Sequence, residues 1–334
     1  MVPSGETAVL ARLLKSRILR KYLGRPYFGL NRWIWSHLPA FLCSRRFLRS
    51  YGMHVQALVR LRAARRQYFG TLFFRNRPEL DLLGSLLDQQ RLASSVAISV
   101  LACSKGAEVY SIAWAIRSRH PDLKFSLHAV DISEVILAFA ERGVYSLTNR
   151  EGVTEGEELA RTTWQDQHAS IFERMTDAEM EAMFDREGDH VRVKEGLKEA
   201  VTWHLADAED PELLSLLGPQ DVVVANRFLC HMAPAAAEKC LRSIARLVKP
   251  GGYLFVSGAD VDVRTKVARQ MGWRPVTHLI REVHEGDASL RRAWPLEYWG
   301  LEPLQDDRPG WPTRYASVFQ LGEPCERGVV VHES

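Results

Sequence analysis

The sequence contains few cysteines, and their arrangement gives no metal or redox signature. Its five cysteines are an odd number, scattered through 334 residues without a Cys-x-x-Cys pair. This pattern argues against a disulfide framework and against a zinc site of paired cysteines. We expect the cysteines to be reduced packing residues, which fits a cytoplasmic location, and we predict no metal.

Long hydrophobic runs are also absent. A membrane-spanning helix needs about 18 or more consecutive apolar residues, and the most apolar early stretch, YFGLNRWIWSHLPAFLC, is interrupted by Arg32 and His37. The apolar positions nearest the N-terminus are spaced among basic residues and do not form one block. The sequence therefore predicts neither a transmembrane segment nor a secretory signal.

Acidic residues are nearly missing from the first part of the chain. Residues 1–77 contain fourteen Arg and two Lys against one acid, Glu6, so they have a net charge of +15 in a chain whose total is +3. The spacing of apolar residues predicts basic amphipathic helices within 7–24 and 54–69. Their basic faces are either solvated surfaces of helices packed on their own domain or in a homodimer, or surfaces for an acidic partner or membrane.

Short apolar runs alternate with helical patterns after residue 94. We predict strands within 95–103, 124–131, 221–228 and 253–258, and helices within 107–120, 133–143 and 233–252. This alternation predicts an α/β fold, a doubly wound parallel sheet whose ligands lie beyond the carboxyl ends of the strands. We divide the chain into a basic helical region, 1–92, and a sheet domain, 93–334. An insertion at 149–198 contains acidic helices such as 176–188 and one short strand, 190–194.

Glycine is scarce in the turn after the first predicted strand, VLACSKGAEVYSIAWAI. The turn lacks the three glycines of a dinucleotide-binding fingerprint, which weakens the case for NAD or FAD. An adenosyl compound without phosphates needs only small residues at this turn and a carboxylate at the end of the second strand for its ribose hydroxyls. Asp131 occupies that position, although an Asp at a strand end can also cap the following helix.

Several motifs between about Gln56 and Ala259 occur in an order that resembles one family. The segments TLFFR, ACSKGAEVYS, AVDIS, AERGVYS and VRVKEGLKEAVTWHLADAED are similar to those of CheR-type chemotaxis receptor glutamate O-methyltransferases, which use S-adenosylmethionine. The turn VKPGGYLFV is also frequent in methyltransferases. The resemblance implies a Rossmann-like class I methyltransferase fold with S-adenosylmethionine as cofactor and S-adenosylhomocysteine as product.

The resemblance also implies where the cofactor binds. It places Thr71 and Arg75 near the cofactor, Asp131 on the ribose and Asp207 at the adenine. The full set of expected cofactor-binding residues is Thr71, Arg75, Ala102, Ser104, Gly106, Glu108, Asp131, Ile132, Asp207, Ala208 and Asn226.

The chain departs from the family pattern in three places. Ala107 and Val109 replace a glutamate and a proline of the cofactor loop, and Asp207 replaces an asparagine, which keeps an acceptor for the adenine amino group but loses a donor. After the fourth strand the family has Arg-Asn-Val-Leu-Ile-Tyr. Here Arg227 is shifted by one place and His231 stands at the tyrosine position, so contacts to the methyl acceptor differ.

Methylation of a carboxylate depends mainly on orientation, because a carboxylate with a pKa near ~4 is already ionised at neutral pH. Arginine can hold a carboxylate through two parallel hydrogen bonds. Our candidates for catalytic residues are Arg75, Arg227 and His231, with the arginines holding either the acceptor or the cofactor's own carboxylate. Alternatively, Arg227 forms a surface ion pair and His231 is a packed histidine that caps the next helix.

The sequence thus predicts a carboxyl O-methyltransferase with two competing acceptors. The altered motif and the Trp-rich segment 294–319 favour a small dicarboxylic or aromatic acid, whereas the basic helices favour a glutamate of an acidic protein segment. A nucleic-acid methyltransferase is a further alternative, suggested by the basic region. ANRF stands where base-amino methyltransferases carry Asp/Asn-Pro-Pro-Tyr/Phe, so we expect no specific nucleic-acid partner. A non-catalytic cofactor sensor is the last alternative.

Overall fold

The computed structural model describes residues 25–38, 46–62, 70–89, 95–147, 171–287, 294–296 and 301–322. The chain divides into two compact units, residues 1–65 with 288–304 and residues 66–287 with 305–334. This division differs from our boundary at residue 92, because helix α6 (Arg77–Gln89) packs its leucines into the core of the second unit. The predicted helix at 7–24 lies outside the described residues.

The first unit contains helices α3 (Arg25–His37) and α5 (Arg46–Arg62). The hydroxyl of Tyr51 donates to Oδ1 of Asn31 at 2.8 Å and so joins the two helices. Trp294 packs edge-on against Trp35, with ring centroids 5.4 Å apart, and its indole nitrogen donates to Gln56. This tryptophan of the C-terminal segment is therefore a buried packing residue of the first unit.

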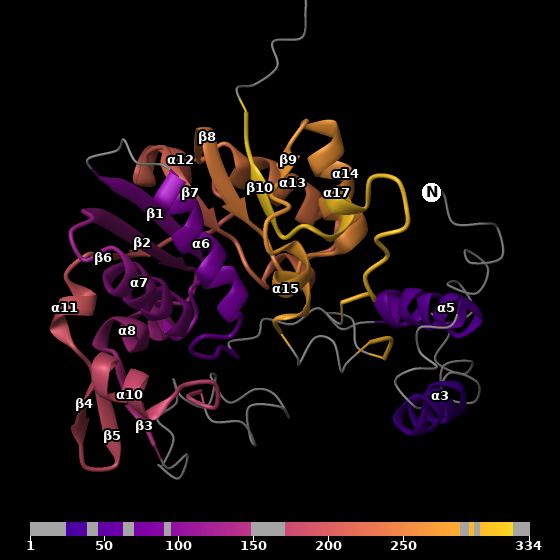
Figure 1. Ribbon diagram of the computed structural model, residues 1–334, viewed down its shortest axis with the longest axis horizontal. Helices are drawn as coiled ribbons and strands as arrows, with labels where there is room; N and C mark the ends of the chain where they lie inside the picture. The colour runs from indigo at the N-terminus through magenta and orange to yellow at the C-terminus, as the bar shows by residue number, and fades with distance from the viewer. Residues whose placement is uncertain are drawn as a thin grey trace, which may run out of the picture. The chain divides into compact units, whose positions relative to one another are not determined.

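A seven-stranded sheet in the order β6-β2-β1-β7-β8-β10-β9 forms the centre of the second unit (Figure 1). The strands β6 (Val201–Leu205), β2 (Phe125–Asp131), β1 (Val96–Leu101), β7 (Gln220–Val224) and β8 (Val248–Phe255) are parallel. Strand β10 (Val318–Gln320) is antiparallel to β8 and to β9 (Arg274–Pro275). The arrangement confirms the predicted doubly wound, Rossmann-like class I methyltransferase fold. The strand order reverses between β1 and β7, where such sheets bind ligands.

Both faces of this sheet are covered, which explains the continuous apolar strands. Successive side chains alternate between faces, so Val222 and Val224 lie in one core cluster and Val223 in the other.

Helices α6 and α7 (Ala107–Arg119) pack in the first cluster, and α12 (Leu213–Leu217), α13 (Pro234–Ala245) and α14 (Val261–Gln270) in the second. Helix α8 (Glu134–Arg142) follows β2. The remaining short helices are η2 (Leu229–His231), α15 (Ile280–Glu285) and α17 (Trp311–Tyr315).

The helix predicted at 233–252 was too long. Helix α13 ends at Ala245, and β8 begins at Val248, so the Pro-Gly-Gly segment belongs to the strand. A Cβ atom at Gly252 would lie 2.7 Å from the carbonyl oxygen of Asp221 on β7. Glycine is therefore required here by close approach of two backbones and not as a helix stop.

The described part of the insertion forms a small second sheet, β3-β5-β4. Strand β5 (His190–Val193) confirms the strand predicted there, and it pairs with β3 (Val144–Ser146) and β4 (Phe184–Glu187). The helix predicted over 176–188 was wrong in its second half. Helix α10 (Asp177–Met183) ends at Met183, and β4 pairs with β5 instead; α11 (Glu195–Lys198) follows.

Candidate active site

The turn after β1 is held in a strained conformation by the acid at the end of β2. Ala102, Ser104 and Gly106 have φ angles of 54°, 52° and 82°, and only glycine adopts this left-handed region without cost. The carboxylate of Asp131 accepts the backbone N–H of Ser104 at 2.9 Å and that of Ser133 at 3.0 Å. Asp131 therefore fixes the turn, and burial raises the pKa of its carboxyl against these hydrogen bonds.

Two apolar side chains are exposed beside Asp131. Ile132 is 57% exposed and Leu205, at the end of β6 opposite Asp131, is 56% exposed. Asp207 follows on the surface, where its carboxylate accepts the N–H of Glu209 at 2.8 Å. Exposed apolar groups next to a buried carboxylate at the carboxyl ends of strands suit a flat ring attached to a hydroxylated sugar. Leu205 was missed from the sequence, because a strand-end leucine is ordinarily buried.

The family motifs contact one another in the fold. The backbone N–H of Phe74, in the TLFFR segment, donates to the hydroxyl of Ser111 at 3.0 Å, and that hydroxyl donates to the carbonyl of Ala107. The hydroxyl of Tyr110 donates to the carbonyl of Ala140 at 2.7 Å. Three motifs that are distant in sequence are therefore joined around the start of α7.

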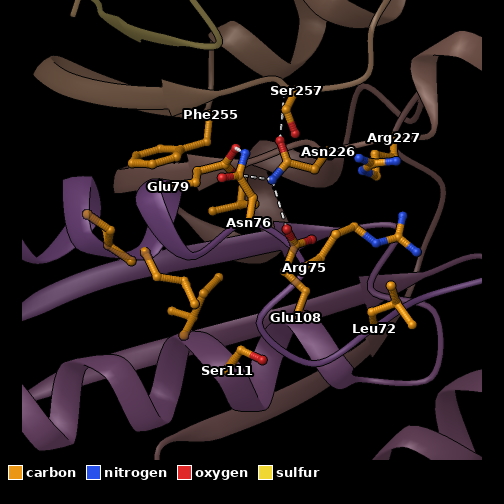
Figure 2. Close-up of a pocket in the computed structure, with 14 residues that line it drawn as sticks. Leu72, Arg75, Asn76, Glu79, Glu108, Ser111, Asn226, Arg227, Phe255 and Ser257 are labelled. Atoms are coloured by element: carbon orange, nitrogen blue, oxygen red, sulfur yellow. Dashed lines mark hydrogen bonds between the residues drawn. The ribbon is translucent and has the colours of Figure 1, made fainter. Parts of the chain in front are cut away.

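A cavity lies next to this junction (Figure 2). Its charged and polar lining comes from five places: the turn before α6, the N-terminal parts of α6 and of α7, the loop after β7 and the loop after β8. These residues are Arg75, Asn76, Glu79, Glu108, Ser111, Asn226, Arg227 and Ser257. The structure thus brings together Arg75, Glu108, Asn226 and Arg227, as expected. Leu72 lines the cavity where we expected Thr71 to lie near the cofactor.

Asn226 connects two carboxyl groups in the cavity. Its amide nitrogen donates to Glu79 at 2.6 Å and to Glu108 at 2.8 Å, while its oxygen accepts the N–H of Ser257 at 2.7 Å. Burial and the neighbouring charge of Glu108 raise the pKa of Glu79 to about 7, and burial also raises the pKa of Glu108. Glu79 was missed because an acid in the first turn of a helix ordinarily serves the helix dipole.

Arg227 has a left-handed backbone, with φ 63°. Its N–H donates to the carbonyl of Ser257 at 2.9 Å, and a Cβ atom at Gly258 would lie 2.7 Å from its Cγ, so glycine is needed beside it. The guanidinium of Arg227 pairs with Asp287, which is 1% exposed and also accepts from Arg174 at 3.1 Å. The expected ion pair of Arg227 therefore exists, but its partner is buried and not on the surface.

The remaining candidates lie outside the cavity lining. His231 ends the short helix η2 and is half-buried, and burial lowers the pKa of its imidazole. Ala208 follows Asp207 at the edge of the sheet beyond β6. Within the described residues, no cluster of His, Cys, Asp or Glu could hold a metal ion, and no helix is long and apolar enough to span a membrane.

The described residues fit S-adenosylmethionine. Asp131, Ile132 and Leu205 offer a polar and an apolar surface for the adenosine, and the neighbouring cavity offers cationic Arg75 and acidic Glu108 to an amino-acid group. A family model described as "CheR methyltransferase, SAM binding domain" matches residues 70–170, and one described as "Methyltransferase domain" matches residues 152–256. A chemotaxis protein methyltransferase of Vibrio parahaemolyticus is 27% identical over 197 residues, which are 57% of this chain and 64% of that protein.

In residues 70–170 the chain is similar to the S-adenosylmethionine-binding domain of CheR methyltransferases. Its cofactor is S-adenosylmethionine. A probable biofilm formation methyltransferase, WspC of Pseudomonas aeruginosa, is 24% identical over 66% of this chain and 48% of its own length. The chain thus spans less than two thirds of the length of these relatives. The chain is also similar to the crystal structure of magnesium protoporphyrin IX methyltransferase from Synechocystis, with a TM-score of 0.33 and 14% sequence identity. The match covers 82% of this chain and 88% of that protein.

Proposed function

We propose that this protein methylates the carboxylate of a glutamate side chain in a protein segment. The observation that carries the proposal is the convergence of Arg75, Glu108 and Asn226 in one cavity beside the turn that Asp131 fixes. The relatives named for chemotaxis and biofilm formation support a protein acceptor more than a small acid.

When bound, the cofactor supplies an electrophilic methyl group on a sulfonium. The chain's residues then have to bind and orient. Asp131 would hold the ribose hydroxyls, Ile132 and Leu205 the adenine, and Arg75 the cofactor's carboxylate. The acceptor glutamate needs no strong base, because its carboxylate is ionised at neutral pH, and positioning it in line with the methyl group lowers the barrier.

The acceptor would reach this centre from the side of Arg227 and His231, which follow β7. Arg227 remains a proposed clamp for the acceptor carboxylate, and it would have to share its guanidinium with Asp287. His231 remains a proposed residue of the acceptor side. A carboxylate requires no proton removal, so this imidazole would orient the acceptor and would not act as a base.

Our first preference, a small carboxylic acid in an enclosed pocket, depended on the altered motif after β7 and on the Trp-rich C-terminal segment. Trp294 instead packs in the first unit, and Tyr315 is buried in the second. Tyr298 and Trp299 lie outside the described residues. The positions of Trp294 and Tyr315 do not support an enclosed pocket formed by this segment, and the relatives favour a protein acceptor. We therefore favour the protein glutamate. The basic region 1–77 would attract the acidic segment that carries it. The homodimer and the cytoplasmic location stay predictions.

The test is to incubate the full chain with methyl-labelled S-adenosylmethionine and two sets of acceptors. One set contains small mono-, di- and aromatic carboxylic acids, and the other contains bacterial membranes that carry chemoreceptors. We expect label in protein that mild alkali releases as methanol, which identifies a methyl ester. Label only in small acids would contradict the protein acceptor, and label that survives alkali would contradict carboxyl methylation. The Arg75→Ala chain serves as the control.

A further inference from the structure

Two carboxyl groups from different helices face the same amide in the cavity. Glu79 lies in the first turn of α6 and Glu108 in the first turn of α7, and both accept hydrogen bonds from the amide nitrogen of Asn226 (Figure 2). The N–H of Ser257 donates to the other end of this amide, which fixes its orientation. Both carboxyl groups therefore share one donor group, and their oxygens line the cavity.

The charges around this pair do not neutralise it fully. Arg75 and Arg227 are the cations that face it, and Asn76 is a further polar neighbour, with its nitrogen 3.5 Å from Glu79. Arg227 already pairs with Asp287, which also binds Arg174. If a ligand carboxylate occupies Arg75, both acids lose part of their compensation, and the cavity then favours a cation placed between them.

We propose that Glu79 is a second carboxylate for the α-ammonium group of the cofactor, beside Glu108, and that cofactor binding releases a proton from this pair. The inference rests on the proposed function, because it needs the amino-acid end of the cofactor to enter the cavity. The ammonium has three N–H donors, enough to reach both carboxylates. The proton leaves to solvent, and no covalent bond changes.

The proton release follows from the electrostatics of the empty pair. Near neutral pH the pair holds a proton part of the time, because the pKa of Glu79 is about 7. An ammonium ion beside it favours the ionised form and lowers that pKa. The affinity for a ligand that carries the amino-acid group should therefore rise with pH between about 6 and 8. The rise should reach about tenfold per pH unit where the pair is mostly protonated.

The experiment is calorimetric titration of the full chain with S-adenosylhomocysteine at pH 7 in phosphate and in Tris, whose ionisation enthalpies differ. We expect a measurable fraction of a proton to be released on binding. In the Glu79→Gln variant we expect affinity lower by about tenfold, the effect of one charge-assisted contact, with little proton release. Glu282→Gln, which changes an exposed first-turn glutamate of α15, should behave as the unmodified chain.

A second ligand distinguishes the part of the site that would bind the amino-acid group from the part that would bind the adenosine. 5′-Methylthioadenosine lacks the amino-acid group, so it should bind the unmodified chain and Glu79→Gln equally; any proton released with it would belong to the Asp131 end. Proton release that is absent for S-adenosylhomocysteine, or unchanged in Glu79→Gln, would overturn the role of Glu79 while leaving the function intact. Failure of the unmodified chain to bind S-adenosylhomocysteine would overturn the function itself. If Glu79→Gln does not fold, the proton count of the unmodified chain still decides.

Discussion

Asp131, the last residue of β2, accepts the backbone N–H of Ser104 at 2.9 Å and so joins the ends of two neighbouring strands. The same carboxylate accepts from Ser133. One side chain thus holds the turn after β1 and the start of α8 in place. The proposed contact with the ribose would use the remaining lone pairs of the carboxylate.

Replacing Asp131 with Asn should damage both stability and cofactor binding. An amide oxygen can replace one carboxylate oxygen, but the amide nitrogen cannot accept from the second N–H. We expect a loss of about 1–3 kcal/mol in the free energy of unfolding, the cost of a buried group left without its partner. Urea unfolding and titration with S-adenosylhomocysteine measure the two effects. Asp88→Asn, at an exposed position, is the control, and equal behaviour of the two variants would contradict the assignment.

Replacing Arg75 with Ala should weaken the binding of S-adenosylhomocysteine and leave the binding of 5′-methylthioadenosine unchanged. Arg75 lines the cavity near Glu108, where the carboxylate of the cofactor would enter. We expect affinity for the complete product to fall by about tenfold or more, since a charged contact is lost. Titration of each ligand in parallel is the measurement. If the affinities for both ligands fall equally, Arg75 supports the fold of the site and does not contact the amino-acid group.

Removing the charge of Asp287 should destabilise the second unit. The carboxylate is buried between Arg174 and Arg227, and Asp287→Asn removes the counterion that these two guanidinium groups share. We expect a loss of about 3–5 kcal/mol, typical of breaking a buried ion pair. Asp306→Asn is the matched control, because its pair with Arg281 is exposed and worth about 0–1 kcal/mol. Similar unfolding curves for the two variants would refute the role given to Asp287.

Stability should decrease as the pH falls below about 6.5, the ordinary pKa of histidine, because of a pair of histidines on β2 and β6. Nδ1 of His128 lies 3.1 Å from Nε2 of His204, and burial lowers the pKa of both imidazoles. The unfolded chain therefore binds more protons in this range, and protonation favours unfolding. The variant His204→Gln should lose less stability between pH 7.5 and 5.5, measured by urea unfolding.

His278→Gln provides the comparison for the histidine pair. His278 is exposed, so its removal should leave the pH dependence unchanged. If His204→Gln and the unmodified chain lose the same stability on acidification, the pair is not the cause.

The sequence predicted those parts of the fold and site that local pattern determines. The position of Asp131 beside the turn after β1 was predictable because the carboxyl ends of adjacent parallel strands meet at one edge of a sheet. Strands β9 and β10 have two and three residues, too few for a periodic pattern. The role of Glu79 depends on the packing of α6 beside α7, which brings residues 79, 108 and 226 together. The pairing of Arg227 with Asp287 joins positions 60 residues apart in the same way.

A crystal structure of the chain with S-adenosylhomocysteine tests the central claim most directly. The account predicts the ribose hydroxyls on Asp131, the adenine against Ile132 and Leu205, and the amino-acid group in the cavity between Arg75 and the pair Glu79 and Glu108. An amino-acid group outside that cavity, or a ribose that does not contact Asp131, would contradict it.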